Sequence, residues 1–492
     1  MGKGKRFRPL GGQTVGLAPT GETTQGRLQQ ATALNQRGRQ QEAAAVCREV
    51  LRWEPRNAKA LVLLATIAYS SGQPYAAIDL TRAALEQNKR SVEACHVMGA
   101  ALMALGRFEE ALACFERALD VKPGNAVIHR NRGNALLALG STAAALDSYD
   151  KALHLAPTDA LAHNNRGIAL NNLGRAPEAV ASWTRAVALD PRYHDALNNL
   201  ATALHAQGHE EEALEHFRAA VALRPDSPLS QCNLGVQLLN MGDLAAARKA
   251  FEIVLLHDPE NPTAKHLAAA LRGDTTEQPP GAYVEKLFDG FSGHFDQLLL
   301  GRLRYTTPQQ IVQALIELTP CRPAPWDVLD LGCGTGLSGA AVAAHARQLV
   351  GVDVSANMLE KARERNIYTR LVHRDIVLWM DAEPAHGYDV VLAADVLVYV
   401  GRLDEAVRAA ERMLKPSGAF AFSVESLADS SSTADSLGEF QLNTSGRYSH
   451  SDAYLRRLAS AHRFDIETHA RVEMRLERGV PVPGWIEVWR RR

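Results

Sequence analysis

A strict 34-residue period runs through the first half of the chain and constrains its fold more than any other feature. Glycine recurs seven times at this spacing, an alanine follows each glycine by five residues, and aromatic side chains and prolines keep the same period. A fixed period of this length is typical of a repeat protein, in which neighbouring units stack to bury a shared core. The period therefore predicts a solenoid. The glycines are Gly38, Gly72, Gly106, Gly140, Gly174, Gly208 and Gly242, and the aromatic set is Phe115, Tyr149, Trp183, Phe217 and Phe251.

This pattern resembles the tetratricopeptide (TPR) repeat over about residues 25–260. The resemblance implies an all-α solenoid of about seven antiparallel helix pairs, whose concave face binds a protein or peptide. The first two repeats depart from it, because Cys47 and Thr81 occupy the aromatic position and Lys89 replaces a proline. We expect residues 262–271 to form a capping helix over the last apolar face, so the array is placed at residues 25–271.

A second set of residues with this period consists of asparagines. Each lies two residues before the small residue of its first helix, at Asn131, Asn165, Asn199 and Asn233. The set resembles the asparagines that line the TPR superhelix of O-GlcNAc transferase and hold the backbone of an extended peptide. A carboxamide suits this task because it both donates and accepts hydrogen bonds. The alternative is that these side chains simply face solvent, since asparagine is common at this position in TPR repeats.

The second half of the chain contains a short apolar run that ends in an acid and is followed by Gly-x-Gly-x-Gly, at residues 328–336. Such a run predicts a buried strand, a tight turn and a helix over residues 337–346. Glycines allow the turn to approach a ligand closely. Taken alone, the turn fits either a dinucleotide or a methyl donor. Leu337, however, occupies the place where the dinucleotide fingerprint needs a third small residue.

Strand-like and helical segments alternate from Trp326 onward, which favours a parallel α/β sheet. Ligands of such sheets bind at the carboxyl ends of the strands. The glycine turn, Asp353, Asp375 and the Ala394–Asp395 corner all fall at these ends. The expected strands are residues 326–331, 348–354, 369–373, 388–394, 418–425, 464–470 and 485–490, and the later helices are residues 403–414 and 451–461.

These motifs, taken in order, resemble the class I S-adenosylmethionine (SAM)-dependent methyltransferases over about residues 283–492, and the resemblance implies a Rossmann-like domain that binds SAM. The glycine turn would contact the methionine side, Asp353 the ribose hydroxyls, and Asp375 the adenine amino group. Ser417 departs from the family, which usually has glycine there. The cofactor-binding residues predicted in this way are Asp330, Gly332, Cys333, Gly334, Gly336, Asp353, Val354, Met358, Asp375, Ile376 and Ala394.

Sequence motifs indicate the residues that would face the methyl acceptor (the acceptor side) less clearly than those that would bind SAM. The corner after residues 388–394 is not the Asp/Asn-Pro-Pro-Tyr corner of enzymes that methylate planar nitrogens, which weakens a DNA-adenine or release-factor-glutamine assignment. We predict Asp395, Tyr399 and His450 as catalytic candidates and Arg447 and Tyr448 as substrate-binding ones. A base is needed only if the acceptor is protonated at working pH. His450 precedes an expected helix, where a structural role competes, and Arg447 either holds an acidic substrate or decorates a loop.

Amino-acid composition and net charge limit the kinds of partner and metal or disulfide site that we expect. A net charge of −1 gives no reason to expect nucleic acid or an anionic membrane as partner. Six scattered cysteines without a C-x-x-C pair predict neither a metal site nor a disulfide framework and fit a reducing cytoplasm. Residues 1–24 are expected to be a disordered basic tail, residues 272–282 a linker, and residues 283–492 the methyltransferase domain. Residues 283–300, with Phe288 on the apolar face, resemble the helix that lids the cofactor in many small-molecule methyltransferases.

The architecture resembles the predicted TPR-repeat methyltransferases of bacteria. The leading hypothesis is a SAM-dependent methyltransferase that acts on a protein or peptide recruited by the TPR array. The alternative is a small acceptor, such as a carboxylate or quinone-like metabolite, with the array docking a partner protein. A non-catalytic scaffold is the third hypothesis, and the intact glycine turn argues against it. The sequence leaves open the acceptor atom, the partner and the oligomeric state.

Overall fold

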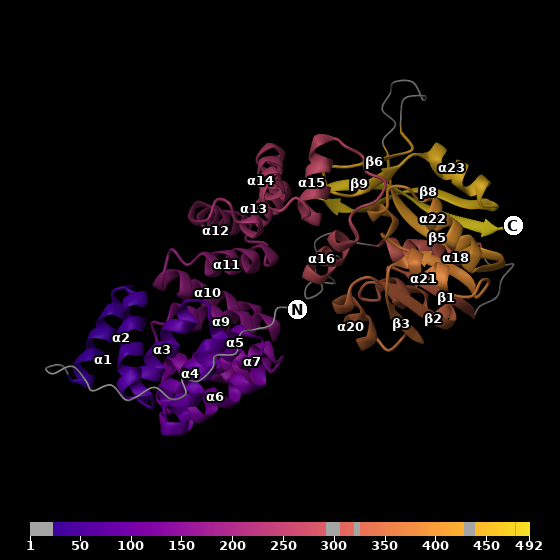
Figure 1. The fold of residues 1–492 in the computed structure, drawn as a ribbon. Helices are drawn as coiled ribbons and strands as arrows, with labels where there is room; N and C mark the ends of the chain where they lie inside the picture. Colours follow the sequence, from indigo (N-terminus) through magenta and orange to yellow (C-terminus); the bar gives the residue numbers. More distant parts are fainter. Residues whose placement is uncertain (1–22, 292–305, 319–324, 428–437, 478) are drawn as a thin grey trace. The chain divides into compact units, whose positions relative to one another are not determined.

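The computed structural model describes residues 23–291, 306–318, 325–427, 438–477 and 479–492. The chain divides into two compact units, Met1–Gln207 and Gly208–Arg492, which are considered separately here (Figure 1). Nearly all of the predicted N-terminal tail lies outside the described residues. The boundaries proposed from sequence at residues 272–282 stay a prediction.

Unit 1 contains two helices for each 34-residue repeat, which confirms the predicted TPR fold. The period glycines have positive φ angles, from 72° to 89° for all seven, so each turn uses a conformation that glycine adopts without strain. The helices are α1 (Thr24–Gln36), α2 (Gln40–Trp53), α3 (Ala58–Ser70), α4 (Pro74–Gln87), α5 (Val92–Ala104), α6 (Phe108–Val121), α7 (Ala126–Ala138), α8 (Thr142–Leu155), α9 (Ala160–Asn172), α10 (Ala176–Leu189) and α11 (His194–Ala206).

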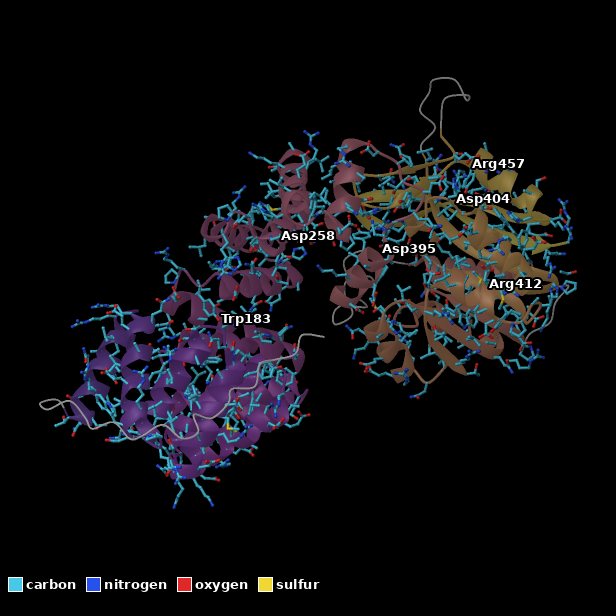
Figure 2. The ribbon with its side chains drawn as sticks, in the orientation of Figure 1. Trp183, Asp258, Asp395, Asp404, Arg412 and Arg457 are labelled. Carbon is cyan, nitrogen blue, oxygen red and sulfur yellow. The ribbon has the colours of Figure 1, made fainter. Side chains whose placement is uncertain are left out.

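The small residues and the aromatic residues of the repeat form one packing feature. A Cβ atom on Gly133 would lie 2.5 Å from the ring of Tyr149, and one on Gly167 would lie 2.6 Å from the indole nitrogen of Trp183 (Figure 2). At these positions the first helix therefore needs a residue without a side chain where the ring of the second helix packs, and α11 has the small residue Ala201 at the equivalent position. This contact explains why the two residue types keep the same period.

Unit 2 begins with the last helices of the repeat pattern: α12 (Glu210–Leu223), α13 (Pro228–Met241), α14 (Leu244–His257) and α15 (Pro262–Arg272). The predicted capping helix is α15. The side chain of Asn261 caps its first turn by accepting from the backbone N–H of Ala264 at 3.1 Å, and Gly273 ends it in a left-handed conformation. The helix α16 (Gly281–Phe291) follows.

The sheet of unit 2 has the strand order β3-β2-β1-β4-β5, with all neighbours parallel. The strand β9 lies antiparallel to β5, and β8 pairs with β9. A small β6–β7 hairpin joins the end of β5 through β7. The strands are β1 (Trp326–Leu331), β2 (Ala346–Asp353), β3 (Arg370–His373), β4 (Tyr388–Ala393), β5 (Leu414–Ser426), β6 (Phe440–Leu442), β7 (Tyr448–His450), β8 (Phe464–Glu477) and β9 (Val480–Arg491).

Helices cover both faces of this sheet, as a Rossmann-like fold requires. Alternate strand residues point to opposite faces, so Val328 packs with α18 and α19 while Leu329 packs with α21, α22 and α23. The remaining elements are α18 (Thr307–Glu317), α19 (Leu337–Val342), η3 (Ala343–His345), α20 (Ala356–Glu364), α21 (Ile376–Ala382), η4 (Leu397–Tyr399), α22 (Asp404–Met413) and α23 (Asp452–Ala461).

The last two long strands extend beyond the sequence-based expectation. Residues 471–477 of β8 alternate charged and apolar side chains, and Pro481 and Pro483 obscure the start of β9 in the sequence. Proline is tolerated where a strand does not need its N–H in a ladder. The hairpin strands β6 and β7 were not predicted at all, since each has only three residues.

Candidate active site

The glycine turn after β1 closes onto the end of β2. Gly332, Gly334 and Gly336 have φ angles of 57°, 53° and 88°, and a Cβ on Gly332 would lie 2.6 Å from the side chain of Val396. The backbone N–H of Gly334 donates to the Asp353 carboxylate at 2.8 Å. Two predicted cofactor motifs that are distant in sequence are therefore joined by one hydrogen bond.

Asp353 is held in place by the backbone on both sides. Its second oxygen accepts from the N–H of Ser355 at 2.8 Å, and burial raises the pKa of the carboxyl group. The side chain is only 6% exposed. Each carboxylate oxygen keeps a further lone pair, so the group can accept additional hydrogen bonds from a bound diol. The following predicted residues, Val354 and Met358, are half-buried and buried, respectively.

The helix α16 reaches this same strand end. The Ser355 hydroxyl caps α20 and donates to Asp289 of α16 at 2.6 Å. The aromatic ring of Phe288 meets the edge of Tyr399, with the ring centroids 5.1 Å apart. The first part of the expected lid helix is thus anchored beside Asp353. Residues 292–300 of the prediction lie outside the described residues.

Asp330 is a buried acid beneath the glycine turn. The Tyr368 hydroxyl donates to its Oδ2 atom at 2.6 Å, while Oδ1 is buried and has no hydrogen-bond partner among the residues that the structure describes. Burial raises the pKa of this carboxyl to about 7. An unsatisfied buried acceptor below a glycine turn fits a site that takes up a ligand donor. Burial also raises the pKa of the nearby Cys333 thiol, so this residue contributes packing rather than a thiolate.

The third predicted cofactor position has a structural partner of its own. Asp375 caps α21, and its Oδ1 atom accepts from the N–H groups of Val377 and Leu378 at 2.9 and 3.0 Å. Its side chain is exposed, whereas Ile376 and Ala394 are buried. Capping leaves the second carboxylate oxygen of Asp375 to a ligand, so the two roles are compatible.

The predicted acceptor side is organised by a residue that the sequence did not reveal. Arg475 of β8 is 3% exposed and donates to Asp395 at 2.9 Å and to Glu477 at 3.2 Å. It also pairs with Glu425 at the end of β5. Asp395 follows β4 with a φ angle of 58°, and its N–H donates to Ser423 at 2.9 Å (Figure 2). A left-handed non-glycine residue at a strand end is frequent at functional sites.

Arg447 joins the same network from the β6–β7 hairpin. Its Nε donates to the Tyr399 hydroxyl at 3.2 Å, and its guanidinium also pairs with Glu477. Three of the predicted acceptor-side residues, Asp395, Tyr399 and Arg447, are therefore linked through Arg475 and Glu477.

His450 and Tyr448 lie on the other side of the hairpin and are fully buried. The Nε2 atom of His450 lies 2.9 Å from the Gly401 carbonyl, and desolvation lowers the pKa of the imidazole to about 4. The Tyr448 hydroxyl lies 2.6 Å from the Thr276 hydroxyl. The geometry gives both residues structural partners, while their predicted catalytic and substrate roles stay predictions. The cap of α23 is Ser451 rather than His450.

Three of the four asparagines that keep the 34-residue period (the asparagine ladder, Asn131, Asn165, Asn199 and Asn233) contact a side chain of the preceding repeat. The side chain of Asn165 donates to Asn134 at 2.8 Å, that of Asn199 donates to Asn164 at 3.0 Å, and Asn131 contacts His96 at 2.9 Å. One amide N–H of each is thereby used within unit 1. Asn233, in unit 2, is half-buried like the other three. The sequence did not indicate the partners His96, Asn134 and Asn164, because these residues do not occupy the ladder position of their repeats.

Some site residues were not predicted from the sequence, and they differ in how clearly the sequence indicates them. Glu425 sits at the end of β5, where an acidic residue is a readable cue for a site. Arg475 and Glu477 lie between two predicted strands, in a segment for which the sequence predicted no element, so no local pattern could associate them with Asp395. Tyr368 precedes β3 and reaches Asp330 only through the fold.

Family models match both halves of the chain. A methyltransferase domain model covers residues 328–418, and tetratricopeptide repeat models cover residues 97–160, 164–228 and 204–271. A further model, described as anaphase-promoting complex (cyclosome) subunit 3, covers residues 36–118. The chain joins a TPR array to a methyltransferase domain.

The chain is also similar to curated methyltransferases. Malonyl-[acyl-carrier protein] O-methyltransferase of Methylovorus sp. is 31% identical over 29% of this chain and 49% of its own length. Demethylmenaquinone methyltransferase of Tropheryma whipplei is 29% identical over 31% of this chain and 61% of its own length. The chain thus spans about half the length of these relatives. The crystal structure of the TPR protein YrrB shares 23% identity over 38% of this chain and 96% of that chain, with a TM-score of 0.33.

Among the described residues, none of the helices has the length and apolar character needed to cross a membrane.

Proposed function

We propose that the chain is a SAM-dependent methyltransferase that modifies a protein or peptide recruited by its TPR array. SAM dependence rests chiefly on one observation, the hydrogen bond of Gly334 to Asp353. It joins a turn of left-handed glycines to a buried acid at the neighbouring strand end, which is the geometry needed to cradle the two ends of a nucleoside-containing ligand.

The residues of the site fit SAM. Asp353 would accept from the ribose hydroxyls, Asp375 from the adenine amino group, and the unpartnered oxygen of Asp330 from a donor on the methionine side. When bound, SAM supplies an electrophilic methyl group on a sulfonium. The chain then has to orient the acceptor and exclude water. Phe288 and Asp289 on α16 are placed to cover the site from one side.

The charge on the acceptor side favours an acceptor that is neutral or cationic, such as an amine nitrogen. Within the described residues, Arg447 and Arg475 are already paired with three carboxylates, those of Asp395, Glu425 and Glu477. A carboxylate acceptor would have to compete with these groups for the two guanidinium ions. A protein amine would instead find carboxylates with lone pairs to spare.

The peptide part of the proposal is supported by the ladder of Asn131, Asn165 and Asn199. Their carboxamides are oriented by hydrogen bonds to the preceding repeat, so less side-chain entropy is lost when they meet a peptide. Asn233 carries the same chemistry one period later.

A small-molecule acceptor is the second candidate, and the names of the curated relatives favour it. Those relatives are a malonyl-[acyl-carrier protein] O-methyltransferase and a demethylmenaquinone methyltransferase. In that case the TPR array would dock a partner protein and take no part in acceptor binding.

The deciding experiment incubates the full chain with methyl-labelled SAM and cell lysate, and separates protein from small molecules. We expect the label in protein, stable to alkali as N-methyl groups are. Alkali-labile label in protein would indicate a carboxylate ester and contradict the amine inference. Label confined to small molecules would reject the protein substrate, and absence of transfer together with absence of SAM binding would reject the enzyme.

The ladder is tested by changing Asn131, Asn165, Asn199 and Asn233 together to alanine. We expect protein labelling to fall by at least about tenfold, since a hydrogen bond contributes roughly 0.5–1.5 kcal/mol and four positions are lost. SAM affinity, measured by calorimetry, should be unchanged. The exposed asparagines Asn171 and Asn240 changed to alanine serve as the matched control. Equal loss of labelling in both variants would remove the peptide-cradle role.

A further inference from the structure

We infer that α15, the last helix of the TPR array, helps to assemble the acceptor side. His266 on α15 is the positioning residue that fixes the β6–β7 hairpin and thereby Arg447. The inference rests on the proposed function, because it gives Arg447 a role next to the acceptor. It concerns only unit 2, in which α15 and the hairpin belong to one compact unit.

His266 makes the central contact. The imidazole is 2% exposed, and its Nε2 atom lies 2.8 Å from the carbonyl oxygen of Gly446, the residue directly before Arg447. Desolvation lowers the pKa of His266, so the neutral ring with a proton on Nε2 donates this hydrogen bond. The ring also packs on Tyr283 at 4.5 Å and on Tyr448 at 6.0 Å between centroids. A buried donor with a single backbone acceptor fixes that backbone position.

The turn of the hairpin is fitted to α15. Gly446 has a φ angle of 79°, and a Cβ atom there would lie 2.9 Å from both Leu267 of α15 and the Tyr283 hydroxyl. Ala269 and Ala270 of α15 form a buried cluster with Leu442 and Tyr448 of the hairpin. The helix and the hairpin therefore share a small hydrophobic core, and Phe440 packs against both this core and the core of the sheet.

The segment expected to be a linker strengthens this attachment. Thr276 meets the Tyr448 hydroxyl at 2.6 Å, and the hydroxyl of Thr275 accepts from the N–H of Leu442 at 3.3 Å. The carbonyl of Glu277 accepts from the N–H of Arg402 at 2.8 Å, and its carboxylate pairs with the same arginine at 2.7 Å. Residues 275–277 thus hold the hairpin and the loop after η4.

The consequence reaches the acceptor side through Arg447. Its guanidinium bonds Tyr399 and Glu477, and Glu477 in turn meets Arg475, which holds Asp395. A shift of the turn at Gly446 would move Arg447 out of this network. The TPR helix α15 therefore decides whether the acceptor side is assembled, while the glycine turn and Asp353 are connected to it only indirectly, through α16.

The test compares full-length His266→Ala and His266→Gln with the wild-type chain. Glutamine can return an amide N–H to the position of Nε2, whereas alanine cannot. The exposed His257→Ala on α14 is the matched control. Three quantities are measured: hydrogen exchange of the backbone amides of residues 440–450, SAM affinity by calorimetry, and the rate of label transfer from methyl-labelled SAM into lysate protein.

We expect His266→Ala to speed hairpin exchange by about tenfold and to slow transfer by at least as much, because one buried hydrogen bond and its packing are lost. SAM affinity should stay within threefold, and His266→Gln should restore most of both losses. Thr276→Val, which removes only the contact to Tyr448, should act in the same direction and keep the test open if His266→Ala fails to fold. Unchanged hairpin exchange in His266→Ala, or failure of glutamine to rescue, would overturn the inference. If the wild type binds no SAM, the proposed function fails, while the exchange data still decide the coupling.

Discussion

The two sides of the candidate active site are built in different ways. The cofactor side comes from neighbouring parallel strands and the turns that directly follow them, and its central hydrogen bond joins Gly334 to Asp353, at the ends of adjacent strands. The acceptor side gathers Asp395, Glu425, Arg447 and Arg475 from four elements and is held from outside by α15. Strand order alone assembles the first, whereas the second depends on long-range packing.

The difference also concerns charge. On the cofactor side, Asp330 and Asp353 form no ion pair with another described residue, and burial raises the pKa values of both carboxyl groups. On the acceptor side, every described carboxylate of the network faces a guanidinium. We expect a ligand to provide hydrogen-bond donors to the acids of the cofactor side, and the acceptor side to orient the methyl acceptor. Substitutions should affect the two sides independently.

The largest effect is expected for Arg475→Met. Removing a buried cation leaves Asp395, Glu425 and Glu477 facing one another, and breaking such a pair typically costs about 3–5 kcal/mol. Unfolding in urea should show this loss, together with loss of methyl transfer. Arg471→Met on the same strand, where the exposed guanidinium lies over Trp485, should cost less than about 1 kcal/mol. Similar costs for both variants would mean that the network adds nothing to stability.

The second-largest effect is expected for Asp353→Ala, which should affect only the cofactor side. Two charge-assisted hydrogen bonds to the ribose would be lost, which corresponds to about 3 kcal/mol, or roughly a hundredfold weaker SAM binding by calorimetry. Asp381→Ala removes an exposed carboxylate paired with Arg408 and should leave the affinity unchanged. Unaltered binding by Asp353→Ala would place the ribose elsewhere.

Asp330→Asn should change the pH dependence of stability. The folded pKa of about 7 lies above the unfolded value of 3.8, so the folded chain binds the extra proton between them. The resulting stability is complete below pH 3.8 and is lost as the pH rises toward 7. Between pH 5 and pH 8 the wild type should lose roughly 3 kcal/mol more than Asp330→Asn in urea unfolding. Parallel pH profiles would show that Asp330 is not held protonated.

The smallest effect is expected for Ser417→Gly, at the turn inside β5. Ser417 is exposed and has a φ angle of 59°, a region that disfavours side chains. Glycine relieves this strain at some cost in unfolded-state entropy, and a net gain of about 0.5–1 kcal/mol is expected. The melting temperature should rise by a few degrees, and Ser417→Ala should not raise it. A lower melting temperature for the glycine variant would contradict the strain argument.

Much of the fold could be predicted because its signals are local and repeated. The glycine period marked each left-handed turn, and the strand–helix alternation located the parallel strands of the sheet to within a few residues. The extensions of β8 and β9 beyond the predicted strands and the short hairpin were missed, since their pairing is decided by distant neighbours. The hydrogen bonds that tie Asn165 and Asn199 to the preceding repeat were likewise beyond a sequence pattern.

The sequence by itself determined the TPR period, the parallel sheet and the glycine turn, because each follows from backbone conformation and side-chain spacing within a short stretch. Only the tertiary structure decided that Arg475 links Asp395 to Glu425, and that His266 holds the turn before Arg447. Those contacts join residues 50 to 180 positions apart. No local pattern encodes them, since they arise only when the cores of the sheet and of the last TPR helices have packed.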